Sequence, residues 1–281
     1  MDPRIRIQRK SRKRTSGKTR SSLLHSVCRA CLAFLCVVLL HQFLLAAFSI
    51  KMGYETVLTF SKVDSKPYDF AHWNYSRVQL LYGLPPFILF LSAWIVIYFM
   101  FKAQEVRGWY MFGFWWVVFS LLYVSAQLSI APVSTAIGNG TLYQGIPVLV
   151  GYYGVSMYGL IALTVLSGIS NVIFGFVAYR LLMQLSPSRT AVQSQQGKFK
   201  LVNSYYLLPL FIVFPVAVLL SYPHTIFFFG VMFLHGLLWL PGLYFIGYEY
   251  KGSQLRSERL KTGYSFIAVL VVLIVLIRVF M

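Results

Sequence analysis

The sequence predicts an all-α protein, a multi-pass transmembrane helix bundle of about seven spans with a cytoplasmic N-terminus and an external C-terminus. Hydrophobic residues make up 58% of the 281 positions and charged residues only 11%, whereas a soluble domain carries about 25% charged residues. The apolar residues gather into runs of about 17–24, the length that a helix needs to cross a bilayer. Sparse charge and long apolar runs together place the chain in a membrane.

Two regions follow from this pattern. A basic tail over residues 1–22 precedes one transmembrane domain over residues 23–281. Each apolar run defines an expected span, numbered first to seventh along the chain. The expected spans lie near residues 30–50, 78–101, 110–131, 158–181, 203–222, 226–247 and 264–280.

The basic tail contains nine Lys and Arg residues in its first 20 positions, against a single acid, Asp2. Such a segment buries too little apolar surface to fold alone, so we expect a disordered cytoplasmic tail. Anionic lipids are its expected partner, because each basic residue near a membrane surface gains about 1 kcal/mol. Nucleic acid is not favoured as a partner, because no aromatic residue interleaves with these charges.

The connecting segments set the expected orientation. Lys and Arg are frequent in the tail and in segments 102–109, 182–202 and 248–263, and they are missing from segment 132–157. Basic loops stay in the cytoplasm, so the N-terminus is expected there, and seven spans then place the C-terminus outside. The first span is expected to be an uncleaved anchor in a plasma or inner membrane, since a signal sequence has an apolar run of only about 7–15 residues.

Two external segments carry further signals. Within segment 51–77, residues 54–60 alternate well enough for a short strand, and residues 67–75 form an aromatic belt suited to the headgroup level. Segment 132–157 is uncharged and rich in glycine. It either dips into the membrane as a re-entrant piece or lies along the outer surface. Re-entrant backbone needs protein or water around it, so this segment is a candidate cavity wall.

Polar side chains at membrane depth are the first candidate functional residues. His41 and Gln42 interrupt the first span, and His235 interrupts the sixth. Each histidine lies roughly 13 Å from the outer end of its span at 1.5 Å per residue. The two histidines could line a path for a proton, an ion or a substrate. Alternatively, each histidine is neutral and bonds to a carbonyl or a serine, as in ordinary hydrogen bonding between membrane helices.

The sequence predicts no metal site and no cofactor. Neither histidine has a third ligand of suitable type. The cysteines, Cys28, Cys31 and Cys36, include one CxxC pair, but no second CxxC or His pair completes a zinc site. The chain also contains no HExxH motif and no glycine-rich Lys-Ser/Thr loop for a nucleotide.

The fourth span contains the stretch LSGISNVIFG, residues 166–175. Ser167, Ser170 and Asn171 place three polar side chains on about one turn. One interpretation is close helix packing, in which Gly168 and Gly175 let backbones approach and hydroxyl groups bond across the interface.

The same stretch locally resembles the GxSG motif of rhomboid intramembrane proteases. In that family the serine lies on the fourth core helix and its histidine on the sixth. Here Ser170 and His235 fall on the fourth and sixth spans, and Gly236 follows the histidine. The resemblance implies a serine nucleophile at Ser170 with His235 as its base, although Asn171 stands where the family has its second glycine.

The outer ends of the second and sixth spans gather a second polar set: Asp69, His72, Arg77 and His224. Pairing of Asp69 with Arg77 and of His72 with His224 is one expectation. The alternative is interfacial snorkelling and exposed loop salt bridges, which contribute little.

No acidic residue lies within any expected span, which disfavours a carboxylate proton relay and most cation-coupled carriers. The sequence therefore favours a non-catalytic transport, channel or complex-assembly component whose polar interior is lined by the first, fourth and sixth spans. Another membrane protein is a possible partner. The alternative hypothesis is a membrane-embedded serine hydrolase that uses Ser170 and His235.

Overall fold

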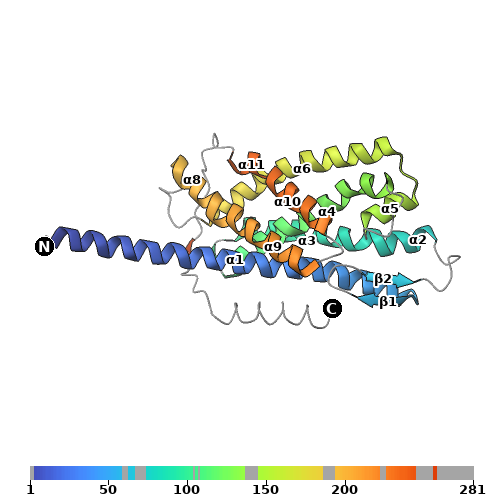
Figure 1. Ribbon diagram of the computed structural model, residues 1–281, viewed down its shortest axis with the longest axis horizontal. Coiled ribbons are helices and arrows are strands. Elements are labelled where there is room, and N and C mark those ends of the chain that lie inside the picture. The colour runs from blue at the N-terminus through green and yellow to red at the C-terminus, as the bar shows by residue number, and fades with distance from the viewer. Residues whose placement is uncertain are drawn as a thin grey trace.

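A computed structural model of the chain describes residues 3–58, 63–66, 74–103, 105–106, 108–136, 145–185, 194–221, 226–244 and 256–257. The long helices lie side by side in a bundle, and α1 is the longest of those described (Figure 1). The elements in chain order are α1 (Pro3–Lys51), β1 (Glu55–Leu58), β2 (Val63–Lys66), α2 (Tyr75–Val78), the π-helical turn η2 (Gln79–Gly83), α3 (Leu84–Lys102), β3 (Glu105–Val106), α4 (Gly108–Ala136), α5 (Ile146–Tyr152), α6 (Met157–Gln184), α8 (Gln195–Val202), the π-helical turn η3 (Asn203–Leu207), α9 (Leu208–Ser221), α10 (Ile226–Leu238), α11 (Leu240–Tyr244) and β4 (Arg256–Ser257).

Six stretches of helix in the described residues are long and apolar enough to cross a membrane. They are Leu24–Lys51, Tyr75–Lys102, Trp109–Ser134, Met157–Gln184, Gln195–Leu220 and Ile226–Tyr244. Each overlaps one of the first six expected spans, so the third span is α4, the fourth is α6 and the sixth is α10 with α11. The prediction of a helical multi-pass membrane protein is confirmed. The seventh expected span, 264–280, lies outside the described residues, and the orientation stays a prediction.

Helix α1 begins at Pro3, so its first turns carry the basic residues of segment 1–22. The division into a tail and a transmembrane domain stays a prediction. Extending an existing helix by one residue adds one hydrogen bond and is easier than starting a new helix. Arg, Lys and Gln, which are frequent here, are also good helix formers. The N-terminal part of α1 projects beyond the other helices in Figure 1.

Helix α4 forms the centre of the bundle. In its most apolar stretch 72% of the residues are buried, against 22% in α6, and it packs against α1, α3, α6 and α10. Stacked aromatic rings fill the core beside it. Trp115 of α4 stacks on Tyr206 with ring centroids 5.7 Å apart, and Tyr206 stacks on Trp239 at 6.2 Å.

Two small sheets lie outside the helices. Strands β1 and β2 pair as an antiparallel hairpin that packs against the end of α1, which confirms the strand expected within residues 54–60. Strands β3 and β4 form a two-residue parallel pair, which joins the connection after α3 to residues 256–257.

The last described span is interrupted at Trp239, where α10 gives way to α11, and Pro241 follows two residues later in the first turn of α11. A proline has no backbone N–H and cannot continue the helical hydrogen bonds of the preceding turn. Trp239 N bonds to Gly236 O in a tighter turn at 3.3 Å, and the Tyr206 hydroxyl donates to the same carbonyl at 2.8 Å. The neighbouring helix thus supplies a donor where the helix is interrupted.

Helix α5 begins beside α4, at the level of Gln127. The Ile146 N–H donates to Gln127 Oε1 at 3.1 Å, and Gln127 lies about 10 Å from the Ser134 end of its candidate span. The preceding residue, Gly145, has φ +89°, and a Cβ there would meet Gln127 Oε1 at 2.4 Å, so only glycine fits. Both alternatives for segment 132–157, a re-entrant piece and a surface segment, stay predictions.

Helices α6 and α11 cross at two glycines. A Cβ on Gly175 would lie 2.3 Å from Trp239 O, and a Cβ on Gly242 would lie 2.6 Å from Gly175 C. These neighbours are backbone atoms and cannot rotate away. The two helices can therefore approach this closely only because both positions lack a side chain.

We expect Gly175→Ala to destabilise the protein by about 1–3 kcal/mol, because the added methyl group must push two backbones apart. Gly168→Ala on the same helix is the matched control, since a Cβ there meets nothing within 4 Å. Thermal unfolding of the detergent-solubilised protein measures both. Equal melting temperatures for the two variants would contradict the close crossing.

Candidate functional site

His41 is fully buried and is held between α1 and α4. The Tyr123 hydroxyl lies 3.2 Å from His41 Nδ1, and the Gln127 amide nitrogen lies 3.1 Å from His41 Nε2. The Ile146 N–H can only donate, so the atom of Gln127 that faces it must be the amide oxygen. The Gln127 nitrogen therefore donates to His41 Nε2, and the proton of the neutral imidazole lies on Nδ1, facing Tyr123.

His235 has a matching arrangement on the other side of the bundle. Its Nδ1 lies 2.8 Å from Asn171 Nδ2, and its Nε2 lies 2.8 Å from Ser129 Oγ. The Trp239 indole N–H donates to Asn171 Oδ1 at 2.7 Å, which fixes the amide orientation, because an indole nitrogen can only donate. Asn171 therefore donates to His235 Nδ1, and the His235 proton lies on Nε2, facing Ser129.

The two histidines therefore lie in separate clusters. Tyr123 and Gln127 are one turn apart on α4 and face His41, whereas Ser129, two positions beyond Gln127, faces His235. Positions two apart on an α-helix point about 200° apart. Helix α4 therefore lies between His41 and His235, and in the described structure they do not form one continuous pair.

Ser167 and Gln42 are both buried, as expected for an interior position. The Ser167 hydroxyl donates to Ser125 O on α4 at 3.2 Å, and Asn171 Nδ2 also donates to Ser167 O at 2.8 Å. Gln42 is 3% exposed, next to His41 on α1. The polar groups of the first, fourth and sixth spans are thus inside the bundle. His41 of the first span faces α4, whereas Asn171 of the fourth span and His235 of the sixth bond to each other, and His235 also bonds to α4.

Ser170 and His235 do not form a catalytic dyad in this structure. Both ring nitrogens of His235 are engaged by Asn171 and Ser129, while Ser170 is half-buried beside Asn171. The His235 nitrogen that could accept a proton already accepts one from Asn171, so it is not available to activate a serine.

The external set is described only in part. The backbone N–H of Arg77 donates to Asn74 Oδ1 at 2.9 Å, which caps the start of α2. Asp69, His72 and His224 lie outside the described residues, so their expected pairing stays a prediction. Within the part of the chain that the structure describes, no three His, Cys, Asp or Glu residues gather as metal ligands.

Several residues of these clusters were not among the sequence candidates: Tyr123, Gln127, Ser129 and Trp239. Gln127 carried a usable signal, because it is the only amide side chain in the third span. Nothing in the sequence indicated the role of Trp239, because an indole in an apolar helix normally packs as a hydrophobic ring.

Compared with known proteins, the chain matches no family model, no curated protein and no solved structure.

We expect Asn171→Leu to destabilise the protein by about 1–2 kcal/mol, because it leaves the Trp239 indole N–H and the His235 Nδ1 without partners. Ser170→Ala is the matched control at the adjacent position and should be near neutral. Chemical and thermal unfolding in detergent measure both variants. A double-mutant cycle with Trp239→Phe should give a coupling energy above 0.5 kcal/mol; purely additive effects would contradict this role of Asn171.

Proposed function

We propose that the chain is a non-catalytic scaffold subunit of a membrane assembly. In this proposal the interior polar residues hold the helices in one fixed arrangement, and the apolar outer faces meet lipid or other membrane helices. The single observation that carries the proposal is the state of the two histidines: each neutral ring has both nitrogens engaged by side chains from other helices.

The histidine clusters support a structural role rather than a chemical one. A catalytic base needs a lone pair that can take a proton from a substrate or a nucleophile. Asn171 and Gln127 each donate an N–H to the only acceptor nitrogen of their histidine. Protonation of either ring would bring two donors face to face, and neither amide can turn without losing the bond to Trp239 or to the Ile146 N–H.

The packing of α4 favours a scaffold over a transporter. Transport by alternating access needs one group of helices to rock against another. Here hydrogen bonds from α4 reach α1, α6, α10 and the start of α5. The stacked rings of Trp115, Tyr206 and Trp239 extend across the same core. Such motion would have to break several of these contacts together.

The outer face of α6 supports the assembly part of the proposal. Only 22% of its most apolar stretch is buried within the chain, and large side chains such as Ile161, Val165 and Ile169 are at least half exposed. In a membrane this face meets either lipid or the helix of another protein.

Extraction of the tagged full-length chain from its own membrane in mild detergent tests the proposal. We expect blue native electrophoresis to resolve a complex larger than the 32.2 kDa chain. Gln127→Leu should lower its yield several-fold, because α5 loses its anchor on α4. Thr164→Val is the control, since Thr164 bonds only to Leu160 O of its own helix in the described structure. Migration of the wild-type chain as a single copy would overturn the proposal.

Two further assays test the competing functions on the same protein. A fluorophosphonate probe should give no labelling that depends on Ser170; labelling that is lost in Ser170→Ala would establish a hydrolase instead. Proteoliposomes should show no proton or potassium flux above protein-free vesicles. Flux that is lost in His41→Leu would establish a transport path instead.

A further inference from the structure

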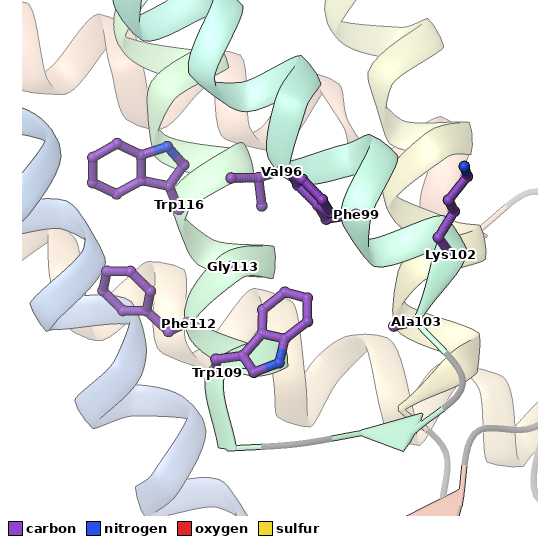
Figure 2. Close-up of a pocket in the computed structure, with 8 residues that line it drawn as sticks. All are labelled: Val96, Phe99, Lys102, Ala103, Trp109, Phe112, Gly113 and Trp116. Atoms are coloured by element: carbon purple, nitrogen blue, oxygen red, sulfur yellow. The ribbon is translucent and has the colours of Figure 1, made fainter.

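An apolar cleft of about 590 Å³ opens on the side of the bundle between α3 and α4. Figure 2 shows Trp109, Phe112 and Trp116 along α4, with Phe99 on α3 opposite them and Gly113 between. At Gly113 the absence of a side chain lets Val96 of α3 approach α4 closely. This cleft lies apart from both histidine clusters, and the scaffold proposal gives it no role.

The cleft lies at a membrane interface. Its rim is formed by Lys102, the last residue of one span, and by Trp109, the first residue of the next. Tryptophan favours the headgroup level, where one part of the ring is in contact with hydrocarbon and the N–H with water. Because the cleft lies at the ends of two spans, it is at an interface whether these ends face the cytoplasm or the outside.

The rim carries a fixed positive charge. Lys102 Nζ lies 4.6 Å from the centre of the Tyr98 ring, an arrangement that holds the ammonium group by a cation–π interaction. None of the described contacts pairs Lys102 with a carboxylate. Figure 2 shows this ammonium group on the outer side of α3, turned away from Trp109, so an anion at the headgroup level would meet it at the rim of the cleft and not inside it.

The floor of the cleft is too tight for a protein helix. A Cβ on Gly113 would lie 3.3 Å from Val96 Cγ1, so α3 and α4 already touch behind the cleft. An α-helix with its side chains is about 10–12 Å across and does not fit between two helices in contact. A single hydrocarbon chain does fit, and the aromatic walls suit it.

We propose that this cleft binds one anionic phospholipid, with an acyl chain against Trp109 and Phe99 and the phosphate at Lys102. This is a site for a single lipid on the side of the bundle, separate from the general attraction of anionic lipids to the basic N-terminal segment. It does not rest on the scaffold function, because it depends only on α3 and α4.

Fluorescence quenching tests the site in full-length protein reconstituted into bilayers. The probes are phosphatidylglycerol and phosphatidylcholine with brominated acyl chains, each added to an unbrominated phosphatidylcholine background. We expect brominated phosphatidylglycerol to quench tryptophan at roughly fivefold lower mole fraction, the preference that one basic residue near the surface provides. Equal quenching by the two lipids would mean ordinary lipid contact without selection and would overturn the proposal.

Charge variants test the role of Lys102. Lys102→Gln should reduce the preference to about one, and Lys102→Arg should keep it. Lys51→Gln is the matched control, because it removes an exposed lysine at the opposite end of the bundle. If Lys102→Gln retains the full preference, or if Lys51→Gln loses it equally, the selectivity does not come from this cleft.

Two tryptophans of equal exposure locate the bound lipid. Trp109, in the cleft, is 41% exposed, and Trp94, outside it on α3, is 42% exposed. Trp109→Phe should reduce the selective quenching, with Trp116 of the same cleft supplying the remainder, whereas Trp94→Phe should leave it unchanged. The reverse result would place the lipid elsewhere and exclude the cleft.

Discussion

The arrangement of the bundle depends on one property of nitrogen donors. A backbone N–H and an indole N–H can donate a hydrogen bond but cannot accept one. The Ile146 N–H therefore orients Gln127, and the Trp239 indole orients Asn171. Each amide in turn presents its own N–H to a histidine and decides which ring nitrogen carries the proton. In a low-dielectric interior an unpaired polar group is costly. These linked hydrogen bonds therefore favour one arrangement of the helices over other arrangements.

Helix α4 connects these two sets of linked hydrogen bonds to the rest of the fold. Its two polar faces meet different neighbours, since Gln127 contacts α1 and the start of α5, while Ser125 and Ser129 contact α6 and α10. Close packing at Gly175 and Gly242 brings the end of the last described span against α6, which places Trp239 beside Asn171. Steric fit and hydrogen bonding thus position the same side chains.

The six described spans could be predicted because bilayer thickness sets the length of an apolar run. The rotation of each helix could not, because a membrane helix is apolar on its lipid face as well as its protein face. His41, Gln42, Ser167 and Asn171 are buried within the bundle, where a polar side chain avoids the cost of facing hydrocarbon. Their partners on α4 were not found, since Gln127 and His41 are 86 positions apart. The local match to a GxSG motif around Ser170 described sequence spacing, not side-chain contacts.

The bond between Ile146 and Gln127 has a consequence for how the protein is made. Helix α5 spans only seven residues, whereas a helix needs about 20 apolar residues to be inserted as a span. It cannot enter the bilayer on its own hydrophobicity, and its first N–H has no acceptor there until α4 is in place. We therefore expect α5 to take its place against α4 only after α4 has been inserted.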